Sequence, residues 1–407
     1  MQWHERFPVS IRQSGHSMKI PHVHTGLDQC VADDFRAFRG RRVGLLANPS
    51  SVDHRFRHLI DLTLAAGLDV IRVFGPEHGL GGTAQDLEAV ADVAKPHPRW
   101  GVPVISLYGS DEASLTPKKE HLADLDVLIV DLPDIGTRFY TFAATLIRTM
   151  RAASGLNLQF AVLDRPNPLG GQNTEGPGIV RGFESFVGEI DIPIRHAMTL
   201  GEIATKVVNS EKLRIDLAPI TCEGWSRKML YPETGLPWIL PSPNMPTFET
   251  ALVYPGGCLI EGTNLSEGRG TTRPFEIFGA PWLDEVKLAK SLNNAGLRGF
   301  FARPLTFKPT FQKHAGQICA GVQIHVTDPA AFEPVRVYTA AIIAARRQNP
   351  DKFGWRTEVY EFRTQPIAID LLYGSDRERK AIEAGAGWQD LADQWNDDQG
   401  PDTVDFN

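Results

Sequence analysis

The stretch "DVLIVDLPD", residues 126–134, decides the fold. Four consecutive apolar residues, 127–130, are followed at once by two acids, Asp131 and Asp134. An apolar run without alternation is typical of a strand buried on both faces, as in a parallel sheet covered by helices. The polar residues that follow such a strand lie at the edge where open α/β sheets bind ligands.

Four other apolar runs, 41–50, 70–74, 102–109 and 158–168, repeat this pattern. Helical patterns at 58–67 and 139–155 separate them. We therefore predict an open, doubly wound α/β domain with a mostly parallel sheet. The polar residues expected at its ligand-binding edge are Asn48, Glu77, His78, Tyr108, Asp131, Asp134, Asp164, Arg165 and Asn167.

Two further helix starts follow from capping patterns. Thr116 and Pro117 have the order of an N-cap and a first helical residue, which predicts a short helix through Leu125. Thr199 has Glu202 three residues later, the spacing of a capping box. Glu202 is expected either to cap this helix or to contact a ligand.

The length of 407 residues suits two domains. We expect a larger domain over residues 21–248 and a smaller α+β domain over residues 249–407, with an active-site cleft between them. The net charge of −7 excludes a basic surface for nucleic acid. No apolar run approaches the roughly 20 residues that cross a bilayer, so a membrane partner is not expected.

The four cysteines stand far apart and form no CxxC pair, which suits neither a disulfide framework nor a zinc site. The first 20 residues lack an apolar core and a cleavage site, so no secretory signal is expected. Both observations favour the cytoplasm, although a periplasmic protein given without its leader would read the same.

No metal or cofactor is expected. The first strand is not followed by GxGxxG, and the chain has no GxxxxGK[ST] loop. His22 and His24 have the HxH spacing of metal-dependent amidohydrolases, which leaves such a hydrolase as an alternative, although no further His and Asp ligands accompany them.

The segment "EGTNLSEGRGTTRPF", residues 261–275, combines acids, hydroxyl groups and Arg269 between glycines. This composition suits an anion or a polyhydroxylated ligand, or a long loop between domains. Several carboxylates, arginines and aromatics without a cofactor motif point to carbohydrate chemistry. Glycoside hydrolysis needs an acid for the leaving oxygen and usually a second carboxylate, and Glu77 is the natural acid.

Nine motifs in order resemble the NamZ-type exo-β-N-acetylmuramidases, glycoside hydrolase family 171. They include "RRVGLLANPSSVD" (41–53), "FGPEHGL" (74–80), "DLPDIGTRFYTF" (131–142), "LDRPNPLGG" (163–171), "IPIRHAMTLGE" (192–202) and "PSPNMP" (241–246). The resemblance covers roughly residues 25 to 405. It implies a Rossmann-like first domain, a smaller second domain and release of N-acetylmuramic acid from the non-reducing end of peptidoglycan fragments.

By the same resemblance, Glu77 is the expected catalytic acid, with Asp134, Glu261 and Glu267 as candidates for the second carboxylate. Arg138 or Arg269 is expected to bind the lactyl carboxylate that distinguishes muramic acid, because arginine suits a carboxylate. A non-catalytic protein that binds muramyl sugars is the other alternative. The substrate-binding residues expected are Asn48, His78, Arg138, Tyr140, Asp164, Arg165, Asn167, His196, Asn244, Glu261, Asn264 and Arg269.

Overall fold

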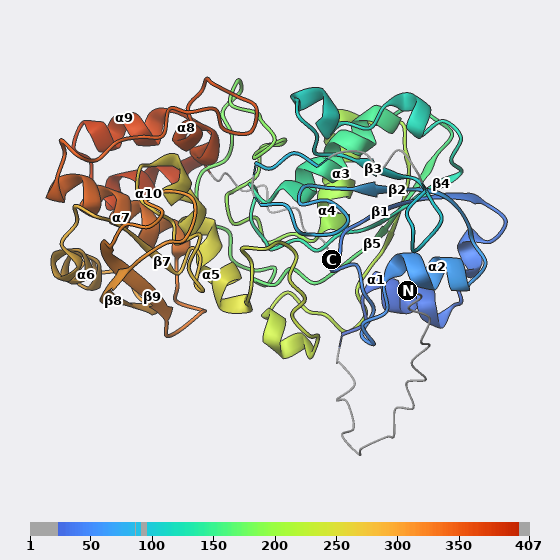
Figure 1. Ribbon diagram of the computed structural model, residues 1–407, viewed down its shortest axis with the longest axis horizontal. Helices are drawn as coiled ribbons and strands as arrows, with labels where there is room; N and C mark the ends of the chain where they lie inside the picture. Colours follow the sequence, from blue (N-terminus) through green and yellow to red (C-terminus); the bar gives the residue numbers. More distant parts are fainter. Residues whose placement is uncertain (1–22, 86, 91–95, 399–407) are drawn as a thin grey trace, which may run out of the picture.

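A six-stranded parallel sheet organises the first half of the chain in the computed structural model, which describes residues 23–85, 87–90 and 96–398 (Figure 1). The strands lie in the order β3-β2-β1-β4-β5-β6, and each neighbouring pair is parallel. This confirms the predicted doubly wound sheet. The strands are β1 (Arg42–Ala47), β2 (Asp69–Gly75), β3 (Val104–Ser106), β4 (Val127–Asp131), β5 (Gln159–Leu163) and β6 (Asp216–Ile220).

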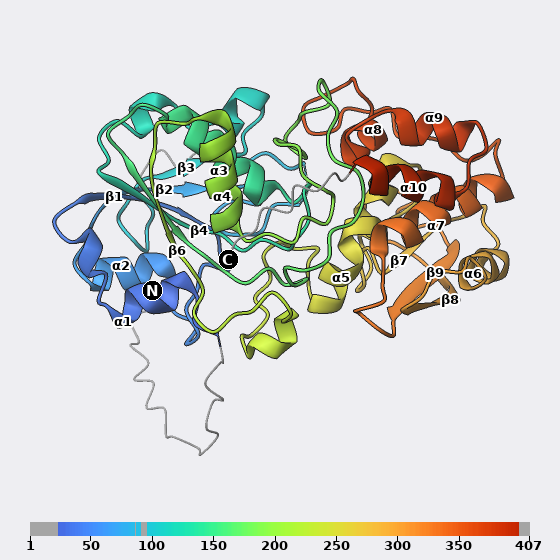
Figure 2. The same cartoon turned by 180° about the vertical axis from the view of Figure 1, so that it is seen from behind.

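Helices cover both faces of this sheet, which explains why its strands are apolar without alternation. On one face, α1 (Gly26–Ala32) and α2 (Leu59–Ala65) pack on a cluster that includes Leu45. On the other face, α3 (Thr141–Ala153) and α4 (Leu200–Glu211) pack on the main core (Figures 1 and 2). The strand order reverses direction between β1 and β4, so the topological switch point lies there.

One capping prediction is confirmed and the other is wrong. Thr199 and Glu202 form the predicted capping box at the start of α4, and Glu202 also pairs with Arg227. The helix predicted from Thr116 to Leu125 does not form. Thr116 closes the 3-10 turn Glu112–Leu115 by donating its backbone N–H to Ala113, and a second 3-10 turn covers Lys119–His121.

The second half of the chain builds a smaller α+β body beside the sheet (Figures 1 and 2). Its antiparallel sheet has the order β7-β9-β8. The expected boundary between residues 248 and 249 falls in the first turn of α5. The elements are α5 (Phe248–Gly257), β7 (Ile277–Ala280), α6 (Glu285–Asn293), β8 (Phe300–Phe307), β9 (Cys319–Val326), α7 (Pro334–Gln348), α8 (Ala368–Tyr373), α9 (Arg377–Glu383) and α10 (Trp388–Asp398).

Buried polar groups join the two bodies. The guanidinium of Arg138, 3% exposed, donates to the carbonyl oxygens of Pro177 (2.7 Å), Ile192 (2.9 Å) and, in α8, Leu372 (2.7 Å). Glu175 accepts the backbone N–H of Arg336 at 2.8 Å, in the first turn of α7. A carboxylate at a helix N-terminus satisfies donors that the helix itself cannot pair. The relative position of the two bodies is therefore fixed by specific hydrogen bonds.

In the described part of the chain, no helix has the combination of length and apolar character needed to cross a membrane. His22 of the HxH pattern and the start of the expected first domain, residues 21 and 22, lie outside the described residues. His24 pairs as an isolated bridge with Glu223.

Candidate active site

An interdomain cavity lies where the carboxyl end of the large sheet meets the smaller body. We define it by Glu77, His78, Tyr140, Glu261, Arg269 and Glu361, which line it together with Asn244. Its empty space is about 490 Å³, counting the opening to solvent. The cavity thus brings together six residues predicted from sequence. Three come from the strand-end loops (Glu77, His78 and Tyr140), and three come from later segments (Asn244, Glu261 and Arg269).

The tip of β2 delivers Glu77 and His78 into this cavity. Glu77 is 5% exposed and accepts the hydroxyl hydrogen of Thr141, the first residue of α3, at 2.5 Å. His78 adopts a left-handed backbone (φ 68°), which is uncommon for a residue with a side chain. Its Nδ1 lies 2.9 Å from the Ala84 carbonyl oxygen. Since a carbonyl only accepts, we assign the proton to Nδ1, which leaves Nε2 as an acceptor.

Glu261 and Arg269 form an ion pair on the opposite wall. The guanidinium of Arg269 donates to Glu261 at 2.6 Å and lies 5.0 Å from the ring centre of Phe275. Tyr360 donates its phenol hydrogen to the other carboxylate oxygen of Glu261 at 2.8 Å. Burial raises the pKa of Tyr360 well above 10, so its phenol stays protonated. Both oxygens of Glu261 are thus held by donors of the protein.

Glu361 reaches the cavity from a strained hairpin turn. Tyr360 and Arg363 exchange both backbone hydrogen bonds at 2.9 Å, and the two residues between them have positive φ, 46° for Glu361 and 65° for Phe362. This is the geometry of a two-residue type I′ turn, which favours Asn-Gly. Side chains at such positions cost of order 1–3 kcal/mol and cluster at functional sites. The carboxylate of Glu361 accepts the phenol hydrogen of Tyr108 at 3.1 Å.

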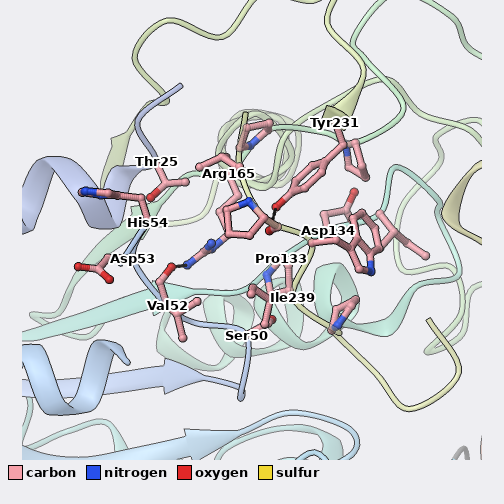
Figure 3. Close-up of a pocket in the computed structure, with 17 residues that line it drawn as sticks. Thr25, Ser50, Val52, Asp53, His54, Pro133, Asp134, Arg165, Tyr231 and Ile239 are labelled. Carbon is pink, nitrogen blue, oxygen red and sulfur yellow. Dashed lines mark hydrogen bonds between the residues drawn. The ribbon is translucent and has the colours of Figure 1, made fainter. Parts of the chain in front are cut away.

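Asp134, a candidate for the second carboxylate, lies outside the interdomain cavity. Its Oδ2 accepts the backbone N–H of Gly136 at 2.6 Å and lies 3.2 Å from Nε2 of His196. Nδ1 of His196 accepts the backbone N–H of Met198 at 3.1 Å, which places the ring proton on Nε2, toward Asp134. Asp134 faces a second hollow instead, lined also by Thr25, Ser50, Arg165, Tyr231 and Trp238 (Figure 3).

Glu267 and Asn264 support the loop that carries Arg269 rather than lining the cavity. Glu267 lies 3.0 Å from the ammonium of Lys313 and 3.5 Å from Nε of Arg269. The side chain of Asn264 donates to the Lys352 carbonyl at 2.7 Å and accepts from the backbone of Gly354 at 3.1 Å.

Four other predicted residues build the strand-end loops. Asn48 donates to the Pro241 carbonyl at 2.8 Å, and Asn167 donates to the Met198 carbonyl at 2.8 Å. Arg165 holds Asp131 through two nitrogens, at 2.6 and 2.8 Å. Asp164 accepts the backbone N–H of Gly201 in α4 at 3.1 Å and the hydroxyl hydrogen of Thr199 at 2.6 Å. Burial raises the pKa of Asp164 to about 6.

The arginine expected at the ligand edge has a different position. Arg138 follows β4 as predicted, but its guanidinium turns into the contact between the two bodies and binds three carbonyl oxygens. Of the two arginines expected to bind the lactyl group, Arg269 is the one that lines the cavity.

Among the described residues, Asp28, Asp53 and His54 offer ligand atoms within 4.8 Å of one another, the spacing of a metal site. Their oxygens already have protein donors. Asp28 accepts from Thr25 at 2.9 Å and lies 2.8 Å from Nδ1 of His54, and Asp53 accepts two nitrogens of the Arg57 side chain, at 2.8 and 2.6 Å. The group fits an internal hydrogen-bond network better than a metal site.

The residues of the cavity that were not foreseen from sequence include Thr141, Tyr360 and Glu361. Thr141 stood inside a predicted helix pattern. Tyr360 and Glu361 lie in a stretch with no motif, and Glu-Phe carries no signal for a type I′ turn. Only the folded chain brings this turn to Glu77.

Family models and relatives agree on what the chain resembles. The amino-terminal model of the exo-β-N-acetylmuramidase NamZ matches residues 43–249, and its carboxy-terminal model matches residues 252–400. A peptidoglycan β-N-acetylmuramidase NamZ of Bacillus subtilis (strain 168) is 40% identical over 378 residues, 93% of this chain and 88% of that protein.

Two crystal structures of DUF1343 family proteins from Bacteroides fragilis NCTC 9343 share the fold. One is 33% identical with a TM-score of 0.84 and covers 93% of this chain and 96% of its own. The other is 29% identical with a TM-score of 0.71, over 92% and 95% of the two chains. Both halves of the chain and nearly its whole length take part in these matches. The chain belongs to the NamZ exo-β-N-acetylmuramidase family.

Proposed function

We propose that the interdomain cavity hydrolyses the β-glycosidic bond of N-acetylmuramic acid at the non-reducing end of peptidoglycan fragments. The family and the 40% identical muramidase of B. subtilis support a glycosidase with this substrate. The observation that carries the proposal is the meeting of Glu77 with Glu261, Arg269 and Glu361 in one cavity. Glycoside hydrolysis uses two carboxyl groups that flank the scissile bond.

Glu77 serves as the general acid that protonates the leaving oxygen. Its place at the end of a buried strand, held by the hydroxyl group of Thr141, fixes the carboxyl in a site sheltered from water. A group that is fixed before the reaction needs little reorganisation in the transition state. His78, directly beside Glu77, offers Nε2 as an acceptor for a sugar hydroxyl.

Glu361 serves as the second carboxylate. Of the three acids considered from sequence, only Glu261 lines the cavity, and its two oxygens bind Arg269 and Tyr360. Glu361 lines the same cavity and is held there by a backbone conformation that is unfavourable for glutamate. The phenol of Tyr108 donates to this carboxylate at 3.1 Å, which helps to hold its orientation.

Arg269 binds the carboxylate of the lactyl group of muramic acid. A lactyl carboxylate needs a fixed cation, and Arg269 provides the guanidinium among the residues that line the cavity. Its ion pair with Glu261 and its stacking on Phe275 hold the guanidinium plane in place before substrate arrives. Glu261 is therefore assigned a positioning role.

The assignment of Glu77 is tested with Glu77→Gln, which keeps the shape of the side chain and removes its acidic proton. General acid catalysis is worth roughly 10²–10⁴-fold, so turnover of an unactivated muramyl disaccharide is expected to fall by that factor. An aryl muramide with a good leaving group, which needs less protonation, is expected to lose much less. The matched control is Glu120→Gln, whose side chain is 72% exposed. Near-normal turnover of the disaccharide by Glu77→Gln would show that another group is the acid.

Two further features belong to the same proposal. Residues 21–248 and 249–407 act as the two domains whose junction forms the active site. The protein works in the cytoplasm on recovered wall fragments. Supporting this location, Cys30, Cys222, Cys258 and Cys319 are all free thiols, as expected in a reducing compartment. Fractionation of cells that carry the tagged full-length protein tests the location directly.

A further inference from the structure

A second hollow lies at the topological switch point of the large sheet, outside the interdomain cavity. We call it the switch-point hollow; its walls include Ser50 after β1, Asp134 after β4 and Arg165 after β5, with Tyr231 and Trp238 from the segment beyond β6 (Figure 3). Open α/β sheets bind their ligands in this crevice, where the strand order reverses. The hollow has about 590 Å³ of empty space, counting its opening to solvent.

One residue that lines this hollow has a buried carboxylate oxygen without a hydrogen-bond partner among the described residues. It is Oδ1 of Asp134, whose other oxygen is held by the backbone of Gly136 and lies beside His196. Asp134 is 7% exposed. A buried polar atom with no partner is costly, and such atoms in native proteins call for a ligand or a water.

The polar groups around Asp134 offer acceptors and few donors. The hydroxyl of Ser50 donates to Asn48 at 2.6 Å, and that of Tyr231 donates to the Pro237 carbonyl at 2.8 Å. Thr25 donates to Asp28 at 2.9 Å. These hydroxyl hydrogens are already used within the protein, so the complementary ligand must supply hydrogen-bond donors, as hydroxyl groups do.

The charges of the hollow exclude an anion. Its one guanidinium, that of Arg165, is neutralised by Asp131 through two hydrogen bonds and donates to the Val52 carbonyl at 2.9 Å as well. Asp134 adds negative charge to the wall, Asp53 is paired with Arg57, and no lysine lines it. The imidazole of His54, which also lines the hollow, is held by Asp28 and Arg55, so a phosphate or a lactyl carboxylate would meet no unpaired cation there.

The remaining wall is apolar and partly aromatic. Trp238, partly exposed, stands edge-on to Tyr231 at 5.0 Å between ring centres, and five prolines complete the lining. Sugar rings present apolar C–H faces with hydroxyl groups at their edge, which match an apolar surface with a few acceptors.

We propose that the switch-point hollow binds a neutral hexosamine ring of the glycan, separately from the muramic acid in the interdomain cavity. The two sites are close, since Pro241 lines the hollow and the next residue, Ser242, lines the cavity. The choice of hexosamine rests on the proposed function, because neutral N-acetylglucosamine alternates with muramic acid in peptidoglycan. The site would bind a glycan fragment while its terminal muramic acid is cleaved in the adjacent interdomain cavity.

The test measures binding of N,N′-diacetylchitobiose, which has no lactyl group, to the full chain by ligand-observed NMR and calorimetry. Trp238→Ala removes the indole ring from the wall of the hollow and is expected to weaken chitobiose binding roughly tenfold. Trp238→Phe keeps an aromatic ring and should bind chitobiose within about threefold of the wild type. Asp134→Ala should weaken binding several-fold. The control is Leu240→Ala, on the same segment, 51% exposed and outside the lining.

A separate measurement distinguishes this site from the proposed function. Leu240→Ala should hydrolyse an aryl muramide like the wild type, and chitobiose should still bind to Glu77→Gln. No binding of chitobiose, or equal binding by the wild type, Trp238→Ala and Asp134→Ala, would overturn the sugar site while leaving the hydrolase intact. Binding of free lysine that is lost in Asp134→Ala would overturn it in favour of a cationic ligand. Absence of muramide hydrolysis together with normal chitobiose binding would refute the hydrolase alone.

Discussion

Replacing Glu175 with glutamine is expected to change the pH dependence of stability. Glu175 is 6% exposed and accepts the backbone N–H of Arg336 at the start of α7, so it joins the sheet domain to the smaller body. Burial raises the pKa of Glu175 to about 7 from its ordinary 4.5, and Glu333 adds to the rise, while Arg195 and the backbone donors of α7 oppose it. Glutamine keeps the acceptor oxygen and cannot ionise.

The direction in which stability changes with pH follows from whether the folded or the unfolded state binds the proton of Glu175 more tightly. The folded carboxyl holds its proton more tightly than the unfolded one, so this contribution to stability is complete below pH 4.5 and is lost as the pH rises to about 7. Each factor of ten in proton affinity is worth about 1.36 kcal/mol, so the whole loss is at most about 3.4 kcal/mol. Part of this is already lost at pH 5, so Glu175→Gln should gain about 2.5 kcal/mol relative to the wild type between pH 5 and pH 8.

The assay is urea unfolding of both proteins at pH 5, 6, 7 and 8, followed by circular dichroism. Glu120→Gln is the control, because its side chain is 72% exposed. Unfolding free energies of the wild type and Glu175→Gln that run parallel over this range would refute the reasoning. They would mean that Glu175 stays charged in its buried position.

Two further predictions concern the interdomain cavity. Arg269→Ala should lower kcat/KM for an aryl muramide roughly 10- to 150-fold and reduce its ratio to that for the matching glucosaminide, since a charge-assisted bond is worth about 1.5–3 kcal/mol. An unchanged ratio, or an equal change in the 45% exposed Arg273→Ala, would remove Arg269 from lactyl recognition. Glu361→Asn should relieve about 1 kcal/mol of backbone strain and raise the unfolding free energy, while muramide turnover falls roughly 10²-fold or more. Glu358→Asn, an exposed acid on the same loop, should change neither, and an active Glu361→Asn protein would contradict the assignment.

Most of the sheet and part of the cavity could be predicted from the sequence because their signals are local. Apolar runs that end in polar residues gave β1, β2, β4 and β5, and the register of a parallel sheet brings their ends to one edge. Glu77 and His78 lie at that edge as predicted. The capping box at Thr199 is likewise a local pattern of hydrogen bonds.

The rest depends on tertiary contacts that a local pattern does not record. Arg138 lies at the predicted edge, but three carbonyl oxygens, one of them 234 residues away, determine where its side chain points. Glu361 enters the cavity through a turn whose sequence is unfavourable for that conformation. Thr116 has the residues of a helix start, yet its backbone N–H is used to close the preceding turn. In each case a distant or competing partner overrides local preference.

The hydrogen bonds of Arg138 have a consequence for the interpretation of mutational screens. Its side chain makes no contact with the cavity lining through these bonds, yet it anchors the body that supplies Glu261, Arg269 and Glu361 to the one that supplies Glu77. Removing the guanidinium would leave three buried carbonyls unpaired and let the two walls separate. A shift of about 1 Å between reacting groups can cost 10²-fold in rate. A screen that scores activity alone would therefore rank Arg138 with the acids that touch the sugar, although its role is to hold the two bodies together.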